Sequence, residues 1–277
     1  MAIDYIVDQP CPVKDTLTQE GMISLIKQRD RGMTVLELLM KDGKTRDQAL
    51  ATVVSVQIMT PAGVEDRDYK VSELLDEARV LDDLQKHCDE CLAGRGETFG
   101  CLKSIHYPIS GTAEAWLAAT GKKAVEQGLP HSMALQYIHD NSVTGDQFRQ
   151  MRADANSSFL ELKKPLEVTL FKSILTRKTI YTDQILFLML GYGKVKNPHH
   201  MSMLLSFSDA LKVSDIKPAE ESCEMAVSFT GDNGLESWRS FNLPESGSDD
   251  QSVRELKEFF RTMFVAYVLD RELIVDL

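Results

Sequence analysis

The stretch from His87 to Cys101, HCDECLAGRGETFGC, constrains the fold of this chain more than any other segment. Three of the five cysteines in the 277-residue sequence lie within it, among three glycines. Cys88 and Cys91 form a C-x2-C pair, whose sulfur atoms can face one ion when the backbone turns tightly, and Zn²⁺ holds thiolates at about 2.3 Å. Glycine supplies the backbone freedom for such a turn. The sequence therefore predicts a metal site here.

Two further cysteines complete the predicted site. Cys101 follows Cys91 after nine residues, and Cys11 lies far upstream between two prolines. Four protein ligands give the closed tetrahedral arrangement of a structural zinc site. We therefore expect one Zn²⁺ bound by Cys11, Cys88, Cys91 and Cys101.

Other uses of these residues stay open. His87 and His106 flank the stretch, and either could replace Cys11 as a ligand or orient a ligand through a hydrogen bond. An iron–sulfur cluster also takes four thiolates. A redox-active pair needs a depressed thiol pKa, which the negative charges of Asp89 and Glu90 oppose. Small buried thiols are the simplest alternative, although this suits a lone cysteine better than three among charged residues.

The charge of the chain argues against two classes of partner. Lys and Arg total 31 and Asp and Glu total 42, which gives a net charge of −11. Such a chain repels the phosphates on which general nucleic-acid affinity rests, and also an anionic membrane surface. The longest apolar run, Ile185–Tyr192, is too short to span a bilayer, and the first residues do not resemble a signal peptide. We expect a cytoplasmic protein without nucleic-acid or membrane partners, whose thiols stay reduced.

Hydrophobic spacing and capping signals predict an α+β fold that is predominantly helical, has short β-hairpins, and is pinned in its N-terminal half by the Cys-ligated metal. We assign residues 1–155 to a helix-rich metal-binding region and residues 156–277 to an α+β region, with a single domain as the alternative. Helices are predicted near residues 17–30, 35–41, 46–55, 72–87, 112–127, 131–140, 145–154, 166–176, 183–191, 198–211 and 250–270. Hairpins are predicted around residues 61–63 and 231–234, and a last strand over residues 272–277. Gly32 and Gly43 are the predicted ends of the first two helices.

Function follows less directly from the sequence. The last predicted helix carries an apolar stripe, which is more typical of a core than of a partner-binding face. The adjacent His199 and His200 point about 100° apart on a helix, so we interpret them as polar residues of a helix end. Because no nucleophile, base and acid stand out together, we expect an interaction or regulatory protein with a protein partner. The alternative is an enzyme that uses an iron–sulfur cluster for electron transfer or an open zinc site for hydrolysis. The stripe comprises Leu256, Phe259, Phe260, Met263, Phe264 and Tyr267.

Overall fold

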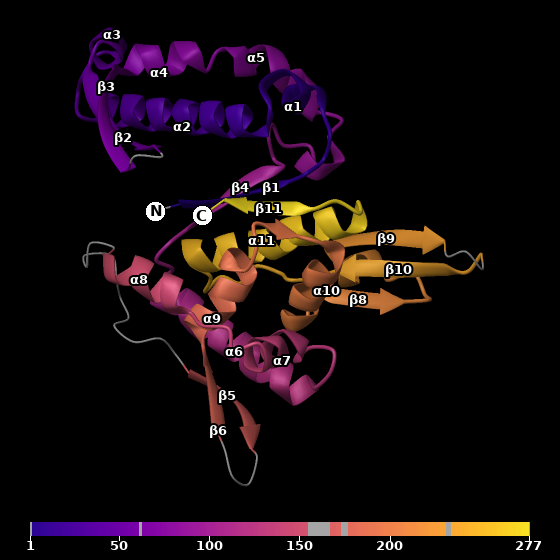
Figure 1. Ribbon diagram of the computed structural model, residues 1–277. Coiled ribbons are helices and arrows are strands. Elements are labelled where there is room, and N and C mark those ends of the chain that lie inside the picture. Colours follow the sequence, from indigo (N-terminus) through magenta and orange to yellow (C-terminus); the bar gives the residue numbers. More distant parts are fainter. Residues whose placement is uncertain (1, 61–62, 155–166, 173–176, 231–233, 277) are drawn as a thin grey trace. The chain divides into compact units, whose positions relative to one another are not determined.

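The computed structural model describes residues 2–60, 63–154, 167–172, 177–230 and 234–276. It is a mixed α+β structure, 53% helical and 20% strand, with several small sheets, which confirms the predicted fold class at that level. The chain forms two compact units (Figure 1): a smaller unit, Pro10–Gly100, and a larger unit that joins Met1–Gln9 to Cys101–Leu277. The predicted boundary after residue 155 lies outside the described residues.

A four-stranded antiparallel sheet of order β4-β1-β11-β7 organises the larger unit. Its two central strands come from opposite ends of the chain, since Tyr5 of β1 is paired with Val275 of β11. Every residue of β1 after the first is buried. The predicted last strand is confirmed as β11. The strands are β1 (Ala2–Val7), β4 (Leu102–His106), β7 (Val195–Lys196) and β11 (Leu273–Asp276).

Helix α11 (Gln251–Val268) contacts this sheet and fills the core of the larger unit with its apolar stripe. The ring of Phe259 meets that of Tyr5 edge to face, with 4.9 Å between the centroids. Asp250 caps the helix, because its Oδ1 accepts a hydrogen bond of 2.9 Å from the N–H of Val253. The stripe is thus core, as its spacing predicts. Its fully buried members are Leu256, Phe259, Phe260, Met263 and Phe264.

Five shorter α-helices also lie in the described part of the larger unit. The helix predicted over residues 166–176 is wrong, because residues 167–172 form a strand, β5, that pairs with β6 (Arg177–Tyr181). Valine, threonine and phenylalanine in this segment favour a strand. The helix predicted over 183–191 is confirmed, since the α-helix Thr182–Leu186 is followed directly by a π-helix, Phe187–Gly191. The five helices are α6 (Gly111–Gln127), α7 (Met133–Asp140), α8 (Asp146–Asp154), α9 (Thr182–Leu186) and α10 (Pro198–Phe207).

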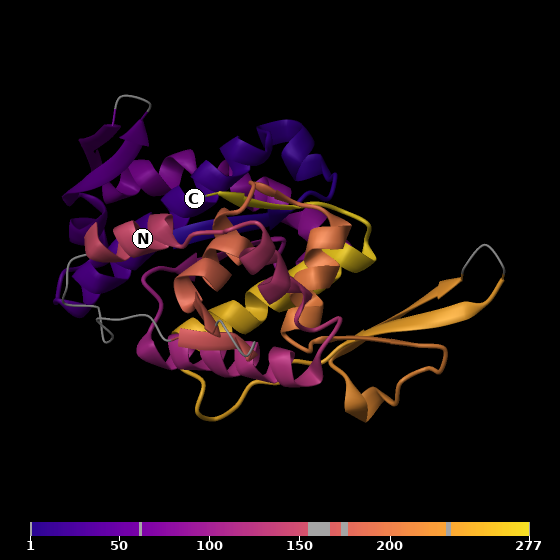
Figure 2. The ribbon, with the colours of Figure 1, turned by 60° about the horizontal axis from the view of Figure 1, so that its bottom comes forward.

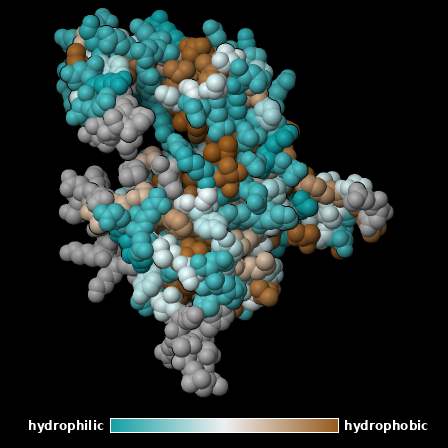
Figure 3. Space-filling model, viewed as in Figure 1, coloured by the Kyte–Doolittle hydropathy of each residue, from teal (hydrophilic) through white to brown (hydrophobic). Residues whose placement is uncertain are grey.

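A three-stranded antiparallel sheet of order β8-β10-β9 extends from the helices of the larger unit (Figure 2). The pairing of Thr230 with Glu236 confirms the predicted second hairpin, while residues 231–233 of its turn lie outside the described residues. The view in Figure 3 shows mostly hydrophilic side chains on the surface of each unit, which is consistent with the net charge of −11. The strands are β8 (Leu211–Ser214), β9 (Met225–Thr230) and β10 (Glu236–Phe241).

A single long helix, α2 (Gln19–Lys41), crosses the smaller unit where two helices are predicted. Gly32 does not end a helix there. A Cβ at this position would lie 2.9 Å from Cδ2 of Leu75, so Gly32 allows α2 to approach α4 (Val71–Glu77) closely. Gly43, with φ of +90°, follows the end of α2 as predicted.

The rest of the smaller unit packs around a core that includes Leu36, Ala49 and Val71. The helix predicted over 46–55 ends at Leu50, because the following residues form the first strand of the predicted hairpin. The helix predicted over 72–87 is divided into α4 and α5. No helix among the described residues is both long and apolar enough to cross a bilayer. The remaining elements are α1 (Pro12–Leu17), α3 (Arg46–Leu50), β2 (Val53–Thr60), β3 (Gly63–Lys70) and α5 (Val80–Leu84).

Candidate functional site

Residues 88–100 fold into four consecutive turns, each closed by a backbone hydrogen bond of 2.9 to 3.0 Å between residues three apart. The last turn requires Gly100, because a Cβ there would lie 2.3 Å from the carbonyl oxygen of Gly94. Gly96 has φ of +79°, a conformation that favours glycine. The glycines of this stretch therefore serve the turns, as the sequence predicts. The N–H donors are those of Cys91, Gly94, Glu97 and Gly100.

Cys88 is a buried thiol at the end of a short 3₁₀ turn, with 6% of the residue exposed. Burial raises the pKa of this thiol, and a hydrogen bond from the backbone N–H of Phe99 opposes the rise. Negative charge at Cys91, Cys11 and Asp89 raises the pKa further. Cys11 and Cys91 therefore lie close enough to Cys88 for their charges to act on it.

Helix α1 carries Cys11 to this position. Cys11 is the N-cap residue, with an extended backbone (φ −159°, ψ 158°), and Pro12 occupies the first turn of the helix, where a missing N–H costs no hydrogen bond. The thiol of Cys11 makes no capping hydrogen bond within the described part of the chain. Because α1 packs against the 3₁₀ turn Gln85–Cys88, the fold brings a cysteine from far upstream to the C-x2-C pair.

The fourth predicted ligand, Cys101, belongs to the larger unit, where it directly precedes β4 and is 5% exposed. His106 ends the same strand, and its Nδ1 lies 2.7 Å from Oε1 of Glu255, so this ring is already hydrogen-bonded within the larger unit. His87 is half-buried in the smaller unit, next to Cys88 in the chain. Cys11, Cys88 and Cys91 thus lie in the smaller unit and Cys101 lies in the larger unit, and the use of these four cysteines as one ligand set stays a prediction.

The three thiols do not form a ready-made set of ligands. Across the described ranges, no group of three or more His, Cys, Asp or Glu side chains is placed to hold a metal ion, so the predicted Cys-ligated metal lacks support from the side-chain arrangement. All five cysteines are free.

A buried charge cluster in the larger unit escapes the sequence analysis. Nη2 of Arg152 on α8 lies 2.6 Å from Oδ1 of Asp183 on α9 and also pairs with Oε1 of Glu114 on α6. Burial raises the pKa of both carboxyl groups in spite of the guanidinium charge. The second carboxylate oxygen of each acid has no hydrogen-bond partner among the described residues. One sequence signal could have indicated that Glu114 is buried: it lies at helical spacing from Leu117 and from other buried residues of α6.

Lys196 and His200 form a second polar group in the interior. Nζ of Lys196 donates to the carbonyl oxygens of Tyr192 at 2.6 Å and Gly193 at 2.7 Å, and burial lowers its pKa to about 8. Burial, together with the charge of Lys196, lowers the pKa of His200 to about 4. Both histidines lie in the first turn of α10, as their interpretation as residues of a helix end predicts, but His199 is exposed whereas His200 is partly buried.

A scan against protein-family models finds no match for this chain, and neither the curated proteins nor the solved structures provide a significant match. The function of the candidate sites therefore has to be inferred from the residues that form them.

Proposed function

We propose that the smaller unit binds one zinc ion through Cys11, Cys88 and Cys91, and that the protein is a non-catalytic interaction or regulatory protein with a protein partner. One observation carries the proposal: α1 holds Cys11 close enough to Cys88 for the charge of one thiol to act on the other. A remote thiol beside a C-x2-C turn is a common source of ligands for structural zinc.

The surroundings of Cys88 suit a thiolate that binds a metal. A hydrogen bond from the backbone N–H of Phe99 stabilises negative charge on Sγ, whereas negative charge on Cys11 and Cys91 opposes it when no cation is present. A bound Zn²⁺ would offset this repulsion, because a metal ion is the largest charge in its site and keeps coordinating thiols deprotonated. Binding would also fix the segment of Cys11 to the turns that follow Cys88.

The identity of the fourth zinc ligand decides whether the site is structural or catalytic. With Cys101 as the fourth ligand, four protein ligands close the site, and zinc is structural. With water as the fourth ligand, zinc could activate that water, which is the enzymatic alternative. An iron–sulfur cluster on the same cysteines is the other enzymatic alternative.

Metal analysis of the freshly purified full-length protein, with its absorption spectrum, tests the proposal. We expect one zinc per chain and no visible absorption. Bound iron with broad visible absorption would contradict the zinc site and support the iron–sulfur alternative. Protein that contains no bound metal would contradict the whole proposal.

Single serine variants assign the ligands. Cys11→Ser, Cys88→Ser and Cys91→Ser should each lose most of the zinc, and Cys101→Ser tests the fourth ligand that the sequence predicts. Cys223→Ser is the matched control, because Cys223 is a half-buried thiol of the larger unit whose Sγ lies 3.8 Å from the carbonyl oxygen of Ala219. Unchanged zinc content in Cys11→Ser would remove Cys11 from the site.

A further inference from the structure

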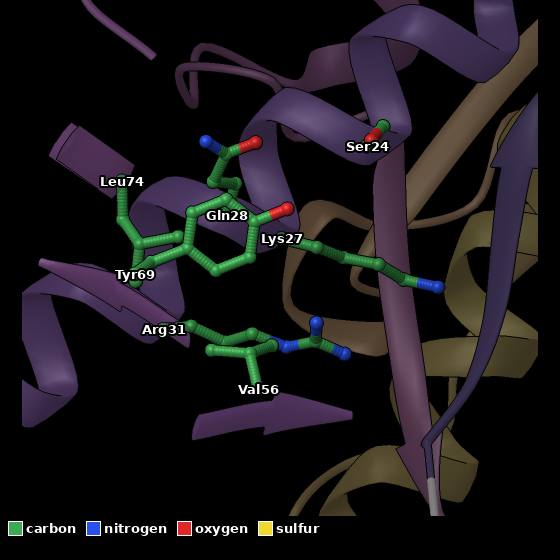
Figure 4. Close-up of a pocket in the computed structure, with 7 residues that line it drawn as sticks. All are labelled: Ser24, Lys27, Gln28, Arg31, Val56, Tyr69 and Leu74. Carbon is green, nitrogen blue, oxygen red and sulfur yellow. The ribbon is translucent and has the colours of Figure 1, made fainter. Parts of the chain in front are cut away.

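A small pocket opens between α2 and the β2–β3 hairpin of the smaller unit (Figure 4). Its volume is about 130 Å³. One wall is a face of α2, and the other comes from β2, β3 and α4. None of the lining residues is acidic, which is unusual in a chain with a net charge of −11. The pocket is lined by Ser24, Lys27, Gln28, Arg31, Val56, Tyr69 and Leu74.

The face of α2 that lines the pocket is polar throughout. Ser24, Lys27, Gln28 and Arg31 follow the i, i+3, i+4, i+7 spacing of one helix face, where a helix that packs against a hairpin normally places apolar residues. The opposite wall is less polar, since it includes Val56. The pocket is therefore bordered on this side by polar and charged side chains.

Positive charge dominates this space. Figure 4 shows the side chains of Lys27 and Arg31 extending in the same direction from α2, beside the ring of Tyr69. Arg31 has no ion-pair partner among the residues that the structure describes. A third cation is near, because the side chain of Tyr69 is hydrogen-bonded to Arg67.

Two carboxylates close to the pocket are already engaged by other groups. Arg67 pairs with Glu65 at 3.0 Å. Glu77 accepts a hydrogen bond from Nε2 of Gln28. These contacts leave the Arg31 guanidinium as a fork of donors at the pocket, and such a fork matches two oxygens of a phosphate group.

We propose that this pocket binds a phosphate group, with Arg31 and Lys27 supplying charge and the hydroxyls of Ser24 and Tyr69 supplying further donors. Arginine gives two parallel N–H···O bonds to a tetrahedral oxyanion, and lysine adds a point charge. The pocket shares no residue with the cysteine group, so this inference does not depend on zinc.

Titration of the full-length protein with inorganic phosphate tests the proposal, with amide chemical shifts as the readout and NaCl added to keep the ionic strength constant. We expect saturable shifts confined to the pocket, at residues 24–31 and around Tyr69. Sulfate should compete, and chloride at the same ionic strength should not. Shifts that grow linearly with concentration, or that spread over every lysine and arginine, would overturn the proposal.

Variants then separate a built site from general attraction of anions. Arg31→Met and Lys27→Met should each weaken phosphate binding by roughly tenfold or more, since each removes a charge-assisted hydrogen bond. Lys41→Met is the matched control, because Lys41 is an exposed cation of the same helix outside the pocket. Equal weakening in Lys41→Met would contradict the proposal. If either pocket variant fails to fold, the localisation of the shifts in the unaltered protein still decides.

Discussion

Nη2 of Arg152 lies 2.6 Å from Oδ1 of Asp183 in the interior of the larger unit, and Glu114 pairs with the same nitrogen. One guanidinium therefore faces two carboxyl groups. Arg149 also acts on Asp183 electrostatically, and Tyr107 is hydrogen-bonded to Arg152. Because burial penalises the charged form of an acid, the pKa of both carboxyl groups is raised.

The raised pKa values make stability depend on pH in a defined direction. Above the unfolded pKa of about 4, the unfolded chain has released protons that the folded protein still holds. The free energy of unfolding must therefore fall as pH rises from there through the folded pKa values. Glu114→Gln mimics the protonated acid, so this variant should become progressively more stable than the parent as pH rises, by about 1.4 kcal/mol for every tenfold difference in proton affinity between the folded and unfolded states. Urea unfolding between pH 4 and 8 measures the difference.

Glu126→Gln is the control for that experiment. Glu126 is an exposed residue of the same helix, α6, so the same chemical change there should leave the pH dependence of unfolding as it is in the parent. A pH profile of Glu114→Gln parallel to that of the parent would show that Glu114 is not protonated preferentially in the folded state.

Removal of the shared cation should cost far more than removal of one acid. Arg152→Met leaves two buried carboxyl groups without their partner, and we expect a loss of about 3–5 kcal/mol in the free energy of unfolding at pH 7. Arg149→Met, on the same helix, breaks an exposed pair with Asp146 and removes the electrostatic effect of Arg149 on Asp183 while Arg152 stays paired, so it should cost about 1 kcal/mol or less. Equal losses in the two variants would show that the buried pair contributes no more to the free energy of unfolding than the exposed pair does.

The backbone beside Asp183 is tightly packed. A Cβ on Gly145 would lie 2.6 Å from the Cβ of Asp183, so Gly145→Ala should destabilise the protein by about 1–3 kcal/mol through overpacking. Gly247→Ala is the matched change, because nothing lies within 4 Å of a Cβ there. Thermal unfolding of the two variants compares them directly, and a neutral Gly145→Ala would mean that α8 and α9 can move apart at little cost.

His200 should make the protein sensitive to acid. Its pKa is lowered to about 4 by burial and by the charge of Lys196, whereas a histidine in an unfolded chain has a pKa of about 6.5. The unfolded state therefore binds the proton first, and stability should be lost as pH falls from about 6.5 to 4, by on the order of 3 kcal/mol.

Replacement of each neighbouring histidine checks this prediction. His200→Gln should remove most of the acid sensitivity, and His199→Gln, which changes an exposed residue, should leave it in place. An NMR titration of the His200 ring with a midpoint near 6.5 would contradict the account.

Local signals predicted helices and their ends best where the responsible atoms are close in sequence. The helix predicted to begin at residue 46 does begin there, where Thr45 and Gln48 form a capping box, with Oγ1 of Thr45 accepting from the N–H of Gln48 at 3.4 Å. The glycines in the turns of residues 88–100 and the apolar stripe of α11 were also predicted correctly, because both patterns are local in the sequence. The prediction that Gly32 ends a helix was wrong. A side chain at this position would collide with Leu75 of α4, and this contact is made with a residue far away in the sequence.

Most contacts between segments that are distant in the chain could not be predicted from the sequence. The pairing of β1 with β11 joins the two ends of the chain, and the cluster of Arg152 collects one residue from each of three helices. The helix α1 that carries Cys11 does contact the turn that ends at Cys88, but the predicted grouping of the four cysteines around one ion stays a prediction.

Zinc K-edge X-ray absorption on the purified full-length protein tests the central claim most directly, because it counts sulfur atoms around the metal. The account predicts one zinc per chain with at least three sulfur ligands at about 2.3 Å, and one sulfur fewer or no bound zinc in Cys11→Ser. Zinc surrounded only by nitrogen and oxygen, or an unchanged sulfur shell in Cys11→Ser, would contradict it.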